Sequence, residues 1–390
     1  MVRTFGVCAS AFAILILLTG CWNRMELDNF AFVQATAIDL ADDDESIALT
    51  IQYYKPVSGT SQGGGPPSQS FINVKTEDDT VFEAVRDMTI HFGRKAQFSH
   101  MRVLIIGERL ARKRHVGEVL DLFSRDHEPR ATVFIMIGKG KAAQYLEKTE
   151  PFIESTIGQQ IRESERMAYL FSGKSVKTTF LDLMLQLKGQ TGVATIPYVY
   201  FDPKNKPKTS PVTALGVMKE GKLVTTVSAK KIESLLMVLN QYKSGVIEVV
   251  CPGQKNKKIK KMDAAEVAEV NTQMAVKIKG ESVAVHVTTK IDGYVGELAC
   301  TTIKTPEDME KFNERVKKTV ERDLKNTVAF FQKKKLDVFG IGNNVYRQNP
   351  ALWKRLKRDW DERFAEIPFT YKIEVNIFNT GANLGVPVSK

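Results

Sequence analysis

The 390-residue chain is long enough for two or three domains, and its 43% hydrophobic and 26% charged residues are typical of a globular protein, not of a disordered one. A net charge of +11 suits an anionic lipid surface, whereas the chain carries no recognisable nucleic-acid motif, so no nucleic-acid partner is expected. Four cysteines are too few for a fold held together by disulfides.

The N-terminus has the parts of a bacterial lipoprotein signal. Arg3 supplies a charge, and residues 7–18 form an uncharged apolar stretch of about 12 residues, which is shorter than the roughly 20 needed to span a bilayer. The stretch ends in Leu18-Thr19-Gly20-Cys21, the pattern of a lipobox. We therefore predict that residues 1–20 are removed and that Cys21 receives an S-diacylglycerol and an N-acyl group, enough acyl chains for stable anchoring. An ordinary signal peptide with an incidental cysteine is the alternative.

Residues 21–200 have the pattern of an α/β domain. Phe30–Leu40 and residues 46–55 flank an acidic turn and predict a β-hairpin with one buried face, and residues 56–68 form a Gly-, Ser- and Pro-rich loop. Helical and buried-strand patterns then alternate. The helices are expected at 78–91, 116–127, 140–148, 154–171 and 178–188, and the strands at 101–107 and 131–138.

The polar segment 201–211 contains three prolines and predicts an interdomain linker, followed by an α+β domain at 212–390. Thr305-Pro306-Glu307-Asp308 predicts the start of a long amphipathic helix that runs to about Lys334. The other elements expected in this half are a hairpin at 212–227, helices at 229–240 and 350–364, and strands at 245–251, within 264–278, at 282–291 and at 369–377. The expected fold class is thus α+β and multidomain, with mixed sheets packed against helices.

Residue patterns typical of catalysis are missing from the sequence. The five histidines are scattered, with no HExxH pair and no cysteine–histidine spacing suited to zinc, and there is no nucleophile elbow or phosphate-binding loop. We therefore expect no enzyme activity, no catalytic residues, no cofactor and no metal. Cys251 and Cys300 both follow strand-like segments, and they could either pair in an oxidising exterior or remain two buried thiols.

Several motifs occur in the order found in one family. Residues 21–27 (CWNRMEL) are similar to a Cys-Trp-Asp/Asn-x-x-Glu-Leu start, and Ile38-Asp39 stands where the first strand of the family ends. Residues 335–342 (KLDVFGIG) resemble an Asp-x-Phe-Gly-x-Gly signature, and Pro350 and Trp353 follow it. Further matching segments lie at 80–86, 99–107 and 123–126. Together they resemble the lipoprotein C subunits of spore germinant receptors, the Ger(x)C family.

The resemblance implies a lipid-anchored, non-catalytic subunit on the outer face of the spore inner membrane. It implies two integral-membrane partners, the receptor A and B subunits, and a role in receptor assembly or signalling during germination. It also singles out the family-motif positions, which are Trp22, Asp39, Asp337, Phe339, Gly340, Gly342 and Trp353.

Two other functions remain open from the sequence. A solute-binding lipoprotein of a membrane transporter predicts two similar α/β lobes around a cleft, and the order of elements after residue 211 is unlike that. A lipoprotein hydrolase is disfavoured because no nucleophile and base can be identified.

Overall fold

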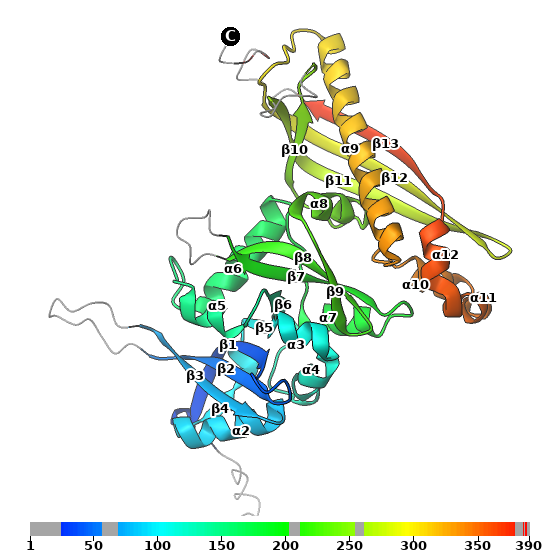
Figure 1. Cartoon of the computed structure of the whole chain (residues 1–390). Helices are drawn as coiled ribbons and strands as arrows, with labels where there is room; N and C mark the ends of the chain where they lie inside the picture. The colour runs from blue at the N-terminus through cyan, green and yellow to red at the C-terminus, as the bar shows by residue number, and fades with distance from the viewer. Residues whose placement is uncertain are drawn as a thin grey trace, which may run out of the picture.

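The computed structural model describes residues 25–56, 69–202, 211–253 and 261–378, together with Gly385 and Pro387. The predictions for Cys21, Trp22 and residues 57–68 lie outside these residues. The described chain forms two sheets covered by helices, which confirms the α+β class (Figure 1).

The first sheet is mixed and has nine strands, in the order β3-β2-β1-β5-β6-β7-β8-β9 with β4 paired to the start of β1. The expected hairpin is present, because β1 and β2 pair in antiparallel register. The expectation of a single buried face is wrong, since β1 is buried on both sides from Val33 onward, with Ile38 in one core cluster and Ala37 in the other. The strands are β1 (Phe30–Leu40), β2 (Ile47–Tyr54), β3 (Phe71–Asp78), β4 (Lys95–Gln97), β5 (Val103–Gly107), β6 (Phe134–Gly138), β7 (Val193–Phe201), β8 (Pro211–Lys219) and β9 (Lys222–Val227).

Helices on both faces explain why the central strands are continuously apolar. One core cluster contains residues of α2 (Val81–Phe92), α3 (Glu108–Lys113), α4 (Val116–Arg125) and α7 (Phe180–Leu187). The cluster on the other face contains residues of α5 (Ala143–Lys148) and α6 (Ile157–Phe171). Two 3-10 turns, η1 (Leu27–Asn29) and η2 (Phe98–His100), precede β1 and β5.

The second sheet has four strands in the order β10-β11-β12-β13, and the long helix α9 (Pro306–Lys334) packs on it (Figure 1). Thr305 caps α9 and Pro306 begins it, as the sequence predicts, and Thr305 and Asp308 together form a capping box. The single helix expected at 350–364 is divided by η3 (Lys357–Asp359) into two short helices. The remaining elements are α8 (Ala229–Val238), β10 (Gly245–Val250), β11 (Met262–Lys279), β12 (Ser282–Glu297), α10 (Ile341–Gln348), α11 (Pro350–Leu356), α12 (Trp360–Glu366) and β13 (Phe369–Phe378).

The segment 201–211 runs from the end of β7 to the start of β8, which are neighbouring antiparallel strands of one sheet. It does not separate the two sheets: β8 and β9 still belong to the first, and β10 begins the second. The two sheets therefore divide after β9, and the domain boundary expected at 201–211 stays a prediction. We call the part around the first sheet the first domain and the part around the second sheet the second domain.

The two domains are unlike each other in strand number and connection, in contrast to the paired lobes that a solute-binding lipoprotein would require. Among the described residues, none of the helices combines the length and apolarity needed to cross a bilayer.

Candidate functional site

Asp337 organises the corner between α9 and α10. The chain leaves α9 through Lys335, whose φ of 57° is left-handed, and the Asp337 side chain turns into the following helix. Its Oδ1 accepts a hydrogen bond from the backbone N–H of Ile341 at 2.9 Å, and its Oδ2 accepts one from Gly342 at 2.7 Å. Asp337 is only 2% exposed, and burial raises the pKa of this carboxyl while the N–H donors oppose the rise. The carboxylate thus serves the otherwise unpaired donors at the start of α10.

Two glycines make this corner possible. Gly340 has a φ of 69°, a conformation that residues with a Cβ adopt only at a cost. Gly342 has no room for a side chain, because a Cβ there would lie 2.6 Å from Cγ2 of Thr191 and 2.8 Å from Cη2 of Trp353. The second glycine therefore allows the backbone of α10 to approach both an indole ring and the first domain.

Aromatic rings pack around the corner. Phe339 is buried against Phe331, with ring centroids 5.7 Å apart, and against Phe369 at 5.8 Å. Trp353 and Trp360 lie edge to face, 5.0 Å apart. The Nε1–H of Trp360 donates to Oδ2 of Asp337 at 3.1 Å, so the aspartate links α10 to α12.

The same corner contacts the turn between α7 and β7 of the first domain. The backbone N–H of Gln190 donates to Oδ1 of Asn343 at 2.7 Å, and the Nε1–H of Trp353 donates to Oε1 of Gln190 at 2.9 Å.

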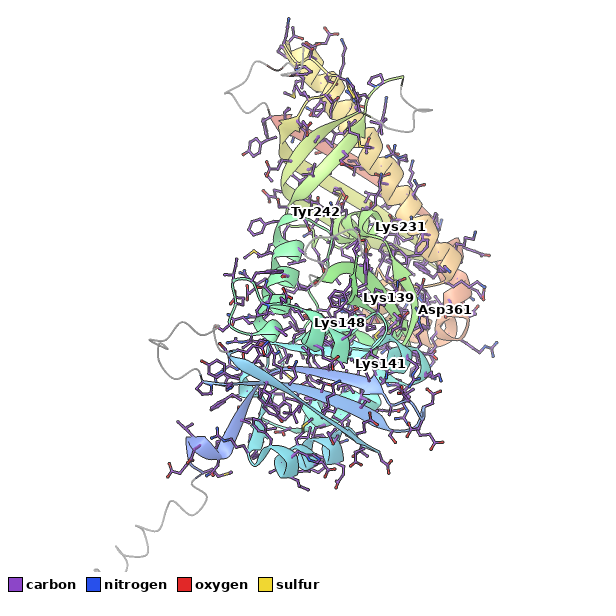
Figure 2. All side chains as sticks on the ribbon, turned by 60° about the vertical axis from the view of Figure 1, so that its left-hand side comes forward. Lys139, Lys141, Lys148, Lys231, Tyr242 and Asp361 are labelled. Carbon is purple, nitrogen blue, oxygen red and sulfur yellow. A yellow bond between two sulfur atoms is a disulfide. The ribbon has the colours of Figure 1, made fainter. Side chains whose placement is uncertain are left out.

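A second contact between the domains is an ion pair, in which Nζ of Lys219 in β8 lies 2.8 Å from Oδ1 of Asp361. Asp361 and Tyr242 both lie along the boundary between the two domains (Figure 2), where a Cβ on Gly173 would overlap the Tyr242 ring. We call the cluster of Asp337, Phe339, Gly340, Gly342 and Trp353 the interdomain corner.

A groove of about 500 Å³ runs beside the interdomain corner. Its walls come from both domains, with Lys177, Leu185 and Gln186 on one side and Phe339 and Asn343 on the other. Leu185, an apolar residue of this lining, is 63% exposed.

Asp39, the other aspartate singled out by the sequence, lies in the first domain and performs a similar local task. Its Oδ1 accepts from the N–H of Ala142 at 2.6 Å and its Oδ2 from Ala143 at 2.9 Å, at the start of α5. It is 4% exposed, and burial raises its pKa against the effect of these two bonds. A Cβ on Gly107 would clash with the Asp39 carboxylate, so this corner too needs a glycine.

Glu165 is a buried acid that sequence reasoning missed. It lies on α6 and accepts hydrogen bonds from the hydroxyls of Ser175 and Thr213, the latter at 2.6 Å. Burial raises the pKa of Glu165 to about 7. A single charged residue on an amphipathic helix gives no sequence sign of this, because both partners come from other segments.

Cys251 and Cys300 form a disulfide, with Cα atoms 6.1 Å apart, that crosses over β11. Beneath it, Asp263 on β11 accepts backbone N–H bonds from Ala299 and Cys300 and forms an ion pair with Arg315 at 3.0 Å. Burial raises the pKa of Asp263, but these donors outweigh it and hold the pKa below its usual value. Cys251, Asp263 and Cys300 form the group of possible metal ligands found among the described residues, and the disulfide bond joins the two thiols of that group.

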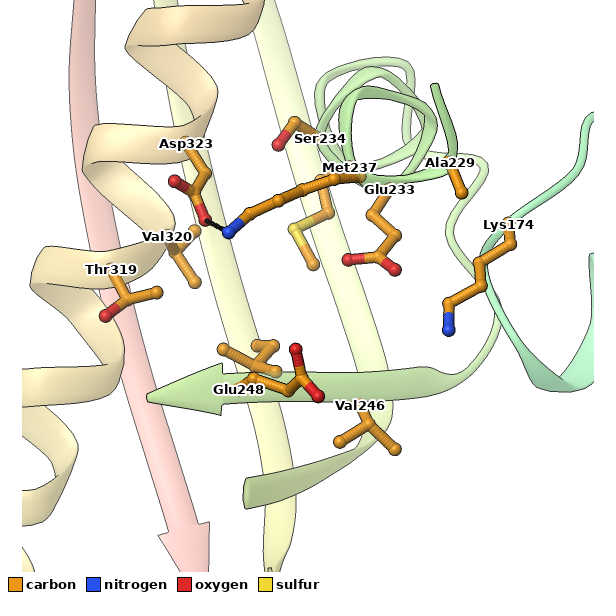
Figure 3. A pocket seen from close by; sticks show the side chains of 12 residues that line it. Lys174, Ala229, Glu233, Ser234, Met237, Val246, Glu248, Thr319, Val320 and Asp323 are labelled. Carbon is orange, nitrogen blue, oxygen red and sulfur yellow. Dashed lines mark ion pairs between the residues drawn. The ribbon is translucent and has the colours of Figure 1, made fainter. Parts of the chain in front are cut away.

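A smaller polar pocket of about 280 Å³ lies between α8, β10 and α9 (Figure 3). Glu233 projects into it, and burial raises the pKa of Glu233 to about 7, with Lys174 opposing and Glu248 supporting the shift. Nζ of Lys230, on α8, lies 3.9 Å from Oδ2 of Asp323, on α9. The lining of the pocket contains no histidine or cysteine.

The structure therefore brings five of the seven family-motif positions into the interdomain corner and puts Asp39 at a separate corner in the first domain. Trp22, like the lipidation residue Cys21, lies outside the described residues. Gln190, Thr191 and Asn343, which complete the interdomain contacts, carry no recognisable motif and emerge only from the fold.

Comparisons with known proteins agree over most of the chain. Residues 23–200 match the spore germination protein N-terminal domain, and residues 213–381 match the C-terminal domain described as spore germination B3/GerAC like. Spore germination protein B3 of Bacillus subtilis (strain 168) is 28% identical over 95% of this chain and 96% of its own length. Spore germination protein KC of the same organism is 26% identical over 94% of this chain and 93% of its own.

The fold is shared as well. The crystal structure of the GerBC protein superimposes with a TM-score of 0.57 at 22% identity, covering 88% of this chain and 97% of that one. The N- and C-terminal family domains together account for most of the chain in the expected order. The chain thus belongs to the Ger(x)C family of spore germination proteins.

Proposed function

We propose that this chain is the lipid-anchored C subunit of a nutrient germinant receptor, and that it acts by contacts and not by catalysis. The observation that carries the proposal is the match of both family domains, in order, over most of the chain. Its partners are the integral-membrane A and B subunits of the receptor, on the outer face of the spore inner membrane.

The hydrogen bonds of the two motif aspartates support a structural role for these residues. Both carboxylate oxygens of Asp39 and of Asp337 accept hydrogen bonds from backbone N–H groups, so neither aspartate is placed as a general base. The interdomain corner instead holds the two domains in one arrangement, which suits a subunit that acts by contacting other proteins. Lipid attachment at Cys21 is supported by the lipobox Leu18-Thr19-Gly20-Cys21.

Spores provide the functional test. A strain lacking this chain is complemented with the wild-type chain or with Cys21→Ala, and germination is followed as loss of optical density with single nutrients tested separately. We expect deletion to abolish the response to at least one nutrient, the wild type to restore it, and Cys21→Ala to restore it less. An undiminished response of the deletion strain to every nutrient, together with impaired uptake of a solute, would reject the receptor role.

A further inference from the structure

We propose that one end of the first domain, formed by η1, the start of β1 and the end of α2, lies against the bilayer surface, with Leu27 and Ile90 inserted among the lipid headgroups. This inference rests on the proposed lipid anchor at Cys21 and adds an orientation to it. We call the set Met25, Leu27 and Ile90 the lipid-facing patch.

Strand pairing brings these residues to the same end of the molecule. β1 and β4 are parallel neighbours in which Phe30 is opposite Lys95, and Nζ of Lys95 lies 5.8 Å from the centre of the Phe30 ring. The segments that lead into the two strands therefore enter at the same end of the sheet. Met25 and Leu27 precede β1, and Ile90, near the end of α2, precedes β4 by a short turn at Gly93.

The exposure of these side chains is unusual. Leu27 is 75% exposed and Ile90 is 79% exposed, and in the described part of the chain only Ile153 exceeds them among the large apolar residues. Met25 beside them is 46% exposed. Exposed apolar side chains are unfavourable in water in proportion to the area they expose. Two of the three most exposed large apolar side chains among the described residues lie in the segments that precede β1 and β4, at one end of the sheet.

The position of the anchor identifies that phase. Cys21 precedes Met25 by four residues, which span at most about 14 Å when extended. An acylated Cys21 would thus hold Met25, at the start of the lipid-facing patch, within about that distance of the lipid glycerol groups. Apolar side chains at this depth enter the boundary between headgroups and acyl chains, as amphipathic segments do.

The charges at this end are mixed. Arg94 and His91 are exposed beside the patch, but so are Glu26 and Asp28, and Lys95 pairs with Glu128 at 2.8 Å. The contact therefore depends on apolar insertion more than on attraction to anionic lipid, and added salt should weaken it little.

The orientation has a consequence for the rest of the molecule. β1, β4 and α2 lie at one end of the structure, while β10 and the start of α9 lie at the opposite end (Figure 1). The second domain, with its disulfide, would then extend away from the bilayer, and the interdomain corner would lie between the membrane and that domain.

The test uses the mature chain with Cys21 replaced by a hexahistidine tether, bound to phospholipid vesicles that contain a nickel-chelating lipid. Because Cys251 and Cys300 are bonded to each other, a cysteine introduced at position 27 or 90 is the single free thiol and takes an environment-sensitive fluorophore. Phe171→Cys is the control: Phe171 is 67% exposed but ends α6, near the boundary with the second domain.

We expect labels at positions 27 and 90 to shift to the blue on tethering and to be quenched by spin-labelled lipid, with the label at 171 unchanged. Equal responses at all three positions, or no response at 27 and 90, would overturn the proposal. The nickel tether replaces the native anchor, so this result is independent of whether Cys21 is lipidated. Mass spectrometry of the chain from spore membranes tests that point separately.

Discussion

The corners at Asp39 and Asp337 use the same local chemistry in two different settings. In each, a buried aspartate accepts backbone N–H bonds from the helix that follows, and a glycine makes room nearby. The Asp39 corner is enclosed by the first domain alone. The Asp337 corner also receives the Trp360 indole, and its helix contacts Gln190 and Thr191 across the domain boundary.

The difference shows that a family motif can stabilise one domain or couple two, although its immediate hydrogen bonds are alike. We expect changes at Asp39 to affect the first domain only. Changes at Asp337 should affect the second domain and its attachment to the first.

The largest effect is expected for Asp337→Ala compared with Asp39→Ala. The first change leaves three buried N–H donors unpaired and the second leaves two, at about 1–3 kcal/mol per donor. Asp337→Ala should therefore lower the free energy of unfolding by about 4 kcal/mol, and Asp39→Ala by about 3 kcal/mol.

Urea titrations of variants made in a Trp22→Phe background separate the two domains, because the remaining tryptophans, Trp353 and Trp360, both report on the second domain whereas circular dichroism reports on the whole chain. Asp337→Ala should move the fluorescence transition, and Asp39→Ala should move only part of the dichroism transition. If Asp39→Ala shifted the fluorescence midpoint as far as Asp337→Ala does, the contrast between the corners would be wrong.

Glu165 differs from the aspartates of the two corners, because its carboxyl accepts hydrogen bonds from two hydroxyls and from no backbone N–H. Its folded pKa of about 7 lies above its ordinary value of 4.5, so the folded chain holds a proton that the unfolded chain releases. The associated stability is complete below pH 4.5 and is lost as the pH rises through about 7, by up to about 3 kcal/mol.

Glu165→Gln, which mimics the protonated acid, should flatten the fall in thermal midpoint between these pH values. Glu163→Gln on the same helix, where the native side chain pairs with Arg166, is the matched control and should keep the wild-type slope. A wild-type slope in Glu165→Gln would show that Glu165 is not the group that titrates.

Glycine replacements at the two corners should have intermediate effects. Gly107→Ala pushes against Asp39, and Gly342→Ala pushes against Thr191 and Trp353, each at about 2 kcal/mol. Only Gly342→Ala should increase hydrogen exchange of the backbone around residues 190–191. Gly296→Ala, which meets nothing closer than 3.4 Å, is the control and should leave both stability and exchange unchanged. Faster exchange at 190–191 in Gly107→Ala would show that the first corner is also coupled to the boundary.

The smallest effect is expected from Gln190→Ala. The variant loses the bond from the Trp353 indole to Oε1 but keeps the backbone bond to Asn343, so the loss should be about 1 kcal/mol. Combined with Gly342→Ala, the two losses should not add, because both act on the same contact. A double variant measured in the same urea titrations checks this, and simple additivity would mean that the two residues act independently.

The sequence predicts elements well where local signals agree. The start of α9 carries a threonine cap, a proline and two acids before a regular apolar repeat, and its bounds follow from them. β7 and α10 escaped prediction, because Pro197 interrupts the first and the second is a short polar helix held by Asp337 and the Gly342 contact. The motif positions were visible in the sequence, but their meeting with Gln190 depends on contacts between distant segments. The disulfide could not be assigned for the same reason, since β11 lies between the strands that precede its cysteines.

The most direct test of the receptor assignment is affinity purification of the tagged chain from detergent-solubilised spore inner membrane, with mass spectrometry of the co-purifying proteins. We predict recovery of two polytopic membrane proteins. Loss of either protein from Asp39→Ala or from Asp337→Ala would indicate whether that protein contacts the first or the second domain. Recovery of an ABC-type permease, or of no membrane protein under gentle detergent, would contradict the account.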